Sequence, residues 1–135
     1  FKEIRIENHL GTGHVVYADR NMTAVIMRNL LQNALKYSRQ KGLVVCRAER
    51  NENFLEITVE DQGIGMTAQR LDALFGMPLT SIPGTIREKG SGLGLLICKE
   101  FAEKNGGSLR AESEPGKGSR FILALPAGEP GERKR

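Results

Sequence analysis

The sequence has few of the features that mark membrane, disulfide-stabilised or nucleic-acid-binding proteins. No run of about 18 apolar residues could span a bilayer and no signal-peptide pattern begins at Phe1, so we expect these residues to be soluble. Only two cysteines occur, and Cys46 and Cys98 lie in apolar runs, which indicates buried free thiols and no disulfide framework or metal site. The net charge is only +4 and the basic residues lack interleaved aromatics, so we expect no nucleic-acid partner.

What remains is the composition of one ordinary globular domain. The 135 residues are 39% hydrophobic and 27% charged, which suits a single packed core. We expect this domain to cover residues 1–126 and to end at Pro126. Residues 127–135, AGEPGERKR, predict a disordered basic tail or linker.

Apolar periodicity predicts short strands, helices and a hairpin in a fixed order. Strands are predicted at residues 2–8, 14–18, 43–50, 54–60, 108–113 and 119–126, and helices at 19–39, 68–75 and 93–104. This order predicts an α+β fold, a two-layer α/β sandwich with about three helices packed on one face of a mixed sheet.

A glycine-rich turn directly precedes the last predicted helix. The turn consists of Gly90, Ser91, Gly92, Leu93 and Gly94. Its backbone can approach an anion closely, and the N-terminus of the following helix favours negative charge. A P-loop would have Lys after the last glycine, and a dinucleotide-binding turn would have a third glycine where Leu95 stands, so both are excluded. A purely structural turn stays the alternative.

Residues 76–89 have no helical or strand period and contain two prolines, which predicts a mobile loop that folds over a ligand as a lid. Arg87 and Lys89, at its end, are placed to meet phosphate oxygens when the lid closes. A solvated pair of charges is the alternative.

The first helix carries an unusual polar stretch. Asp19 is a suitable N-cap residue, and the helix then places Asn29, Asn33, Lys36 and Tyr37 on one face, in line with apolar residues that start the same stripe. Asparagine is a poor residue inside a helix, so two of them on a face directed at the core indicate a polar ligand. A solvated face is the alternative.

A carboxylate follows a predicted core strand. Leu55, Ile57 and Val59 alternate along this strand, and Asp61 continues the same face. Because an unpaired buried charge is costly, Asp61 needs a hydrogen-bond donor, and Gly63 and Gly65 leave room for a flat ligand that supplies it. An Asp-capped turn is an equally good interpretation of DQGIGM from the residues alone.

Four segments together resemble one known family. NLLQNALKYS, DQGIGM, LDALF and GSGLGLLICKEFAEKNGG resemble, in order and spacing, the N box, first glycine box, F box and second glycine box of the catalytic ATP-binding domain of sensor histidine kinases. This domain has the Bergerat, or GHKL, fold. The resemblance covers nearly the whole chain, to Pro126.

The resemblance implies ATP and Mg²⁺ as cofactors. Asn33 would coordinate Mg²⁺ with help from Asn29, Lys36 would contact phosphate, and Tyr37 would pack near the ribose or adenine. Asp61 would accept the adenine amino group, helped by Gly65. The expected nucleotide-binding residues are Asn33, Lys36, Tyr37, Asp61, Gly63, Gly65, Met66, Arg87, Lys89, Gly90, Ser91, Gly92, Leu93, Gly94 and Leu95, and those expected to be catalytic are Asn29, Asn33 and Lys36.

The resemblance also implies transfer of the γ-phosphoryl group to a histidine on a separate dimerisation domain of the same protein, with a response regulator receiver domain downstream. Hydrolytic members of the superfamily have a glutamate where this chain has Asn29, which disfavours ATP hydrolysis. The family's histidine-bearing helix is absent from these residues, so we expect a monomeric catalytic fragment, cytoplasmic, from a parent that can be anchored in the inner membrane. A GHKL ATPase, a serine-directed anti-sigma kinase and an inactive nucleotide-binding docking module stay as alternatives.

Overall fold

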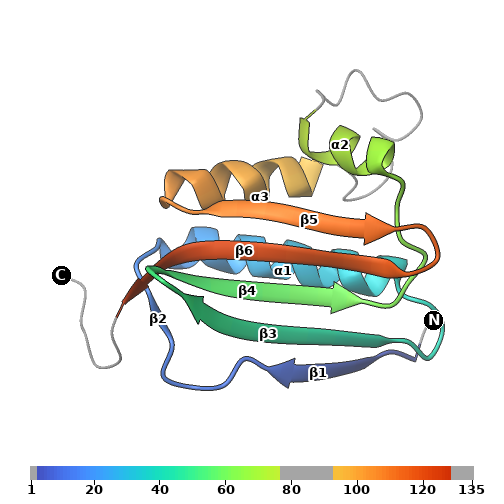
Figure 1. The fold of residues 1–135 in the computed structure, drawn as a ribbon, viewed down its shortest axis with the longest axis horizontal. Helices are drawn as coiled ribbons and strands as arrows, with labels where there is room; N and C mark the ends of the chain where they lie inside the picture. Colours follow the sequence, from blue (N-terminus) through green and yellow to red (C-terminus); the bar gives the residue numbers. More distant parts are fainter. Residues whose placement is uncertain (1–2, 77–92, 129–135) are drawn as a thin grey trace.

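A computed structural model of the protein describes residues 3–76 and 93–128. The elements follow the predicted order along the chain (Figure 1). They are β1 (Arg5–His9), β2 (Val15–Val16), α1 (Arg20–Tyr37), β3 (Leu43–Asn51), β4 (Phe54–Asp61), α2 (Ala68–Gly76), α3 (Leu93–Lys104), β5 (Ser108–Glu114) and β6 (Gly118–Gly128).

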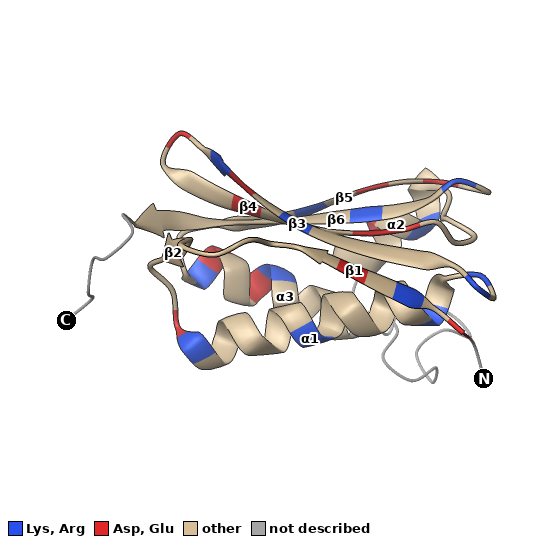
Figure 2. Ribbon diagram, turned by 90° about the horizontal axis from the view of Figure 1, so that it is seen from below, with Lys and Arg blue, Asp and Glu red and all other residues tan. Residues whose placement is uncertain are grey.

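The strands form one mixed sheet covered by helices on a single face. The strand order is β1-β3-β4-β6-β2, and β5 pairs with the same edge of β6 as β2. Only the β1–β3 pair is parallel among the pairs of the described strands. Helices α1 and α3 lie side by side beneath the sheet (Figure 2). The predicted two-layer α/β sandwich is therefore confirmed.

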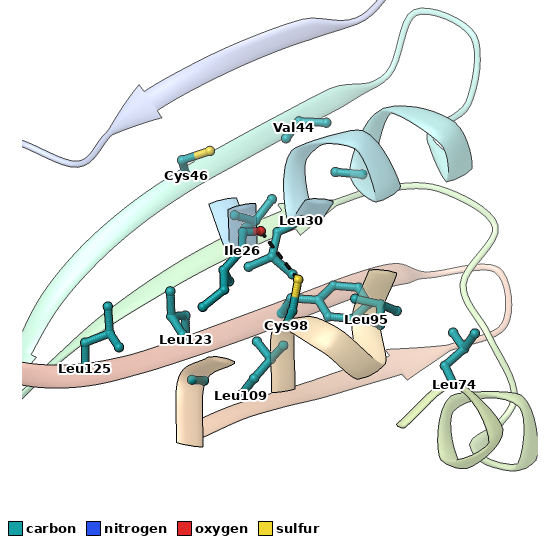
Figure 3. Packing of buried hydrophobic residues seen from close by; sticks show 14 of the residues in the cluster. Ile26, Leu30, Val44, Cys46, Leu74, Leu95, Cys98, Leu109, Leu123 and Leu125 are labelled. Atoms are coloured by element: carbon teal, nitrogen blue, oxygen red, sulfur yellow. Dashed lines mark hydrogen bonds between the residues drawn. The ribbon is translucent and has the colours of Figure 1, made fainter. Parts of the chain in front are cut away.

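The core lies between this helical layer and the sheet (Figure 3). Helix α1 contributes Ile26, Leu30 and Ala34, spaced four apart so that they share one face, and each is at most 1% exposed. Helix α3 and the sheet supply the facing side chains, which include Leu95, Cys98, Val44, Val59 and Leu123. Each fully buried aliphatic side chain contributes about 1.5–3 kcal/mol. Cys46 and Cys98 are both buried free thiols, as predicted.

Side-chain caps fix the starts of two helices where the sequence predicts them. The Asp19 carboxylate accepts a hydrogen bond from the backbone N–H of Met22 at 2.8 Å, and Thr67 Oγ1 accepts one from Arg70 at 3.2 Å. The backbone N–H of Asp19 in turn donates to Asn105 Oδ1 at 2.7 Å. The start of α1 is thus tied to the end of α3.

The last strand is longer than predicted. It continues two residues beyond Pro126 to Gly128, which pairs with Val15 of β2. Proline lacks an N–H, but its carbonyl accepts a hydrogen bond from Tyr17 at 2.9 Å, so the ladder passes through it. The predicted end of the last strand at Pro126 is therefore two residues short. Residues 129–135, most of the predicted tail, lie outside the described part of the chain.

Charged residues form cross-strand pairs at sheet positions that alternate with the core-facing ones. The carboxylate oxygens of Glu60 on β4 lie 3.0 Å from Nη1 of Arg47 and 3.9 Å from Nε of Arg120. Nε of Arg120 also lies 3.6 Å from Oε1 of Glu112. Such exposed pairs add little stability, and they indicate a solvated face. None of the described helices combines the length and hydropathy needed to cross a bilayer.

Candidate functional site

Polar side chains form a row across one end of the helix-facing side of the sheet. Asp61 on β4 pairs in register with Ser119 on β6, which pairs with Ser113 on β5. All three line an open cleft that also includes Ala68 and Leu71 of α2. The end of β4, the β5–β6 turn and α2 meet at this end of the sheet (Figure 1).

Asp61 is a buried carboxylate, as the alternation along β4 predicts. Its side chain is 3% exposed, and its Oδ1 accepts a hydrogen bond from the backbone N–H of Gly63 at 2.8 Å. Burial raises the pKa of the Asp61 carboxyl, while hydrogen bonds from the backbone of Gly63 and Ser119 oppose the rise. No ion pair among the described residues includes Asp61. A neutral donor such as an amino group is thus a suitable partner for it.

The space at Gly63 and Gly65 is used differently from the expectation. A Cβ at Gly63 would collide with the carbonyl oxygen of Tyr37, and one at Gly65, where φ is +70°, would collide with that of Glu114. The glycines therefore let the loop pack against the end of α1 and the β5–β6 hairpin. The expectation that they leave room for a flat ligand is wrong for the Cβ positions, because protein backbone fills that room.

Helix α1 brings its polar residues to the same region. Asn29, Asn33 and Tyr37 are half-buried and Lys36 is exposed, with its Nζ 5.4 Å from the centroid of the Tyr37 ring. The carbonyl of Tyr37 accepts a hydrogen bond from the N–H of Ile64 at 3.2 Å. The C-terminal end of the asparagine-bearing helix is thus attached directly to the loop that follows Asp61.

Asn29 contacts the other helix. Its Nδ2 donates to the Val25 carbonyl at 2.8 Å, and its Oδ1 lies where a Cβ at Gly94 would stand. Gly94 is the second residue of α3, so it lies in the first turn of the helix and not in a turn before it. The glycine at 94 therefore allows α1 and α3 to approach closely at Asn29.

Two further expected residues are buried. Leu95 is 1% exposed and belongs to the hydrophobic core, which leaves its backbone N–H at the start of α3 as the group that can face a ligand. Met66 is 5% exposed. The remaining glycine-turn and lid predictions, for Arg87, Lys89, Gly90, Ser91 and Gly92, fall outside the described residues, as does the side chain of Leu93.

Ser113 and Ser119 also line this cleft and are not among the residues predicted from the sequence. Both serines occupy the helix-facing positions of their strands, where Leu109, Phe121 and other apolar residues precede or follow them. The period of two along residues 108–113 and 119–126 was sufficient to place both hydroxyls on the core face at the end of the sheet that carries Asp61. A serine hydroxyl at an otherwise apolar, core-facing strand position was the signal in the sequence that could have identified both residues.

The donors present suit magnesium better than a metal that prefers nitrogen or sulfur. No cluster of three His, Cys, Asp or Glu side chains occurs within residues 3–76 and 93–128. Mg²⁺ commonly takes only one or two protein oxygens and completes its octahedron with phosphate and water. Asn29, which is half-buried and contacts Gly94 in the first turn of α3, is a side-chain amide of this kind beside an anion-favouring helix start.

The chain is similar in sequence and fold to known proteins. Residues 18–129 match the family of histidine kinase-, DNA gyrase B- and HSP90-like ATPases. Over 110 residues the chain is 41% identical to the sensor protein ChvG of Rhizobium meliloti (strain 1021), a match that covers 76% of this chain and 19% of ChvG. It is 37% identical over 113 residues to the sensor-like histidine kinase SenX3 of Mycobacterium tuberculosis (strain ATCC 25618 / H37Rv), covering 83% and 28% of the two chains.

The fold is also similar to that of a sensor histidine kinase of known structure. The structure of the mycobacterial sensor histidine kinase MprB superposes with a TM-score of 0.76 at 29% sequence identity, covering 93% of this chain and 83% of the other. The present chain spans 19% of the length of ChvG and 28% of the length of SenX3. The chain therefore belongs to the family of histidine kinase-, DNA gyrase B- and HSP90-like ATPases, and within it to the ATP-binding catalytic domains of sensor histidine kinases.

Proposed function

We propose that the chain binds Mg-ATP and transfers the γ-phosphoryl group to a histidine on a dimerisation domain of the same parent protein. The observation that carries this proposal is the buried carboxylate of Asp61, which has no ion-pair partner among the described residues and lies at the same end of the molecule as the asparagine-bearing half of α1. Membership of the sensor histidine kinase family supports it. The receiver domain of a response regulator would then accept the phosphoryl group downstream.

Asp61 would recognise the base. Its carboxylate can accept a hydrogen bond from the exocyclic amino group of adenine, whereas guanine presents a carbonyl oxygen at the corresponding position. A carboxylate facing that oxygen would be repelled. Gly63, Gly65 and Met66 shape the loop beside it, and Tyr37 would pack near the ribose or the base.

Asn33 would hold Mg²⁺ through its side-chain oxygen, with Asn29 assisting and Lys36 contacting phosphate. When bound, the metal neutralises charge on the phosphates. The first backbone amides of α3, among them those of Gly94 and Leu95, lack intrahelical partners and would face phosphate oxygens, because a helix N-terminus favours anions. The proposed roles of Arg87, Lys89 and residues 90–92 as phosphate contacts complete this half of the site.

The side chain at position 29 favours transfer over hydrolysis. An ATPase needs a base that takes a proton from water, and an asparagine amide cannot do so. Here the Nδ2 of Asn29 is engaged with Val25 and its Oδ1 lies against Gly94. An imidazole nucleophile needs no such base, so positioning and charge neutralisation are sufficient for the transfer.

The proposal is tested by incubating the chain with ATP labelled at the γ-phosphate and a separately prepared dimerisation domain carrying the acceptor histidine. We expect an acid-labile, base-stable label on that domain, no label when its histidine is replaced, and only slow release of phosphate without it. Rapid phosphate release without labelling would instead support an ATPase. Label on a serine would support a serine-directed kinase, and neither activity would support a docking module.

A further inference from the structure

The hydroxyl of Ser113 lies at the junction of three segments. Its Oγ is 2.8 Å from the backbone nitrogen of Met66, 3.0 Å from the carbonyl oxygen of Gly118 and 2.8 Å from Ser119 Oγ. One side chain on β5 thus contacts the loop after Asp61 and both residues that begin β6.

All three contacts are satisfied at once by one arrangement of hydrogens. The N–H of Met66 can only donate and the carbonyl of Gly118 can only accept, so Ser113 accepts from Met66 and donates to Gly118. Ser119 then donates its hydroxyl proton to Ser113. Ser113 Oγ accepts two hydrogen bonds and donates one, which leaves it fully used within the protein.

The same serine pair also reaches the other end of the loop. Ser119 pairs in register with Asp61 across β6 and β4, and Oδ1 of Asp61 accepts a hydrogen bond from the backbone N–H of Gly63. The loop of residues 61–66 is therefore attached to β6 at its first residue and to Ser113 at its last. Between these points Gly65 packs so closely on the Glu114 carbonyl that a side chain would not fit.

We propose that Ser113 is a positioning residue for base recognition, which holds the 61–66 loop so that Asp61 and Gly65 present a fixed edge to the base. This inference rests on the proposed function, because it assumes that the loop contacts adenine. Ser113 acts only through Met66 and Ser119, since its own hydroxyl has no capacity left for a ligand. Its loss would therefore reduce discrimination between bases more than it reduces attachment of the triphosphate.

The test uses titrations of the 135-residue chain with Mg-ATP and Mg-GTP. The variants are Ser113→Ala, which removes the hydroxyl, Ser113→Cys, which keeps the volume but bonds weakly, and Ser113→Thr, which keeps the hydroxyl. Ser108→Ala, at an exposed position of the same strand, is the matched control. Hydrogen exchange of the Met66 backbone amide, measured by NMR without nucleotide, reports directly whether its hydrogen bond to Ser113 Oγ is intact.

We expect the ratio of GTP to ATP dissociation constants to fall about fivefold or more in Ser113→Ala and Ser113→Cys, as the loss of one hydrogen bond predicts. The ratio should stay near the wild-type value in Ser113→Thr and Ser108→Ala. Exchange of the Met66 amide should accelerate only where the hydroxyl is lost.

Equal weakening of ATP and GTP, or no weakening, in a folded Ser113 variant would overturn this inference. Unfolding of both Ser113→Ala and Ser113→Cys would also overturn it, because Ser113 would then serve the fold alone. Failure of the wild-type chain to bind ATP, or to prefer it over GTP, would overturn the proposed function itself, so the two failures are distinguishable.

Discussion

The side-chain oxygen of Asn29 on α1 occupies the space where a Cβ would stand at Gly94 on α3. This contact joins the helix proposed to hold the metal to the helix proposed to face the phosphates. Position 94 therefore tolerates only glycine as long as Asn29 keeps its place.

Gly94→Ala is expected to destabilise the domain, although alanine is the better helix former. Replacing glycine by alanine in a helix ordinarily stabilises it, by up to about 1 kcal/mol in the helix interior, so a loss of stability at this first-turn position would reveal the collision with Asn29. Asn29→Ala should restore the room, and the double variant should show a favourable coupling of about 1 kcal/mol or more in urea unfolding. Additive effects of the two changes would contradict the contact.

Asp61→Asn is expected to raise the free energy of unfolding at neutral pH while removing the preference for ATP over GTP. Burial raises the pKa of this carboxyl in the folded state, so its ionised form is disfavoured there. The loss of folding free energy caused by burying this charge begins as the pH rises above the pKa of the unfolded state. It is complete once the pH exceeds the raised pKa of the folded state, as it does at neutral pH. The advantage of the variant should therefore shrink as the pH falls through the raised pKa.

The free energies of unfolding of wild type and Asp61→Asn are measured by denaturant unfolding at neutral and mildly acidic pH. Asp72→Asn, at an exposed position of α2, controls for exchanging a carboxylate for an amide at the surface. A variant less stable than wild type at neutral pH, with a gap that narrows on acidification, would reverse the predicted sign.

Gly65→Ala is expected to destabilise the domain by more than about 2 kcal/mol, because its Cβ would collide with the backbone of Glu114 in addition to adopting a left-handed conformation. Gly13 has a similar φ of +86° with nothing within 4 Å of a Cβ, so Gly13→Ala should cost only about 1 kcal/mol. The difference between the two variants isolates the collision. Equal losses would show that the loop can move away from the hairpin.

Asn33→Ala is expected to weaken Mg-ATP binding about tenfold or more, since it removes a proposed metal ligand, which corresponds to roughly 1.4 kcal/mol. ATP binding without Mg²⁺ should change little. Gln32→Ala, the neighbouring exposed position on α1, should leave both affinities unchanged. An Asn33→Ala variant with undiminished dependence on Mg²⁺ would remove Asn33 from the metal site.

Local sequence patterns predicted most of the fold because the helix and strand periods here are regular. The alternation through Leu55, Ile57 and Val59 placed Asp61 on the core face, and Asp19 and Thr67 fixed two helix starts by hydrogen bonds to nearby residues. Pro126 was misleading as the end of the last strand, because proline ends a strand only where a neighbouring strand needs its N–H.

The parts of the site that sequence could not predict depend on contacts between distant segments. Nothing local to Gly63 or Gly65 reveals that Tyr37 and Glu114 approach them, and nothing near Asn29 reveals Gly94. The position of Ser113 against Met66 likewise follows from the pairing of β5 with β6 and from the path of the loop. Such contacts form only when segments that are distant in the sequence come together in the folded protein.

The central claim is a nucleotide site formed by α1, the loop after Asp61 and the start of α3, and calorimetric titration of the chain tests it most directly. We predict one ATP bound per chain, with an affinity that increases when Mg²⁺ is present and exceeds that for GTP. A folded chain that gives no binding heat with ATP over a range of temperatures, with and without Mg²⁺, would contradict the account.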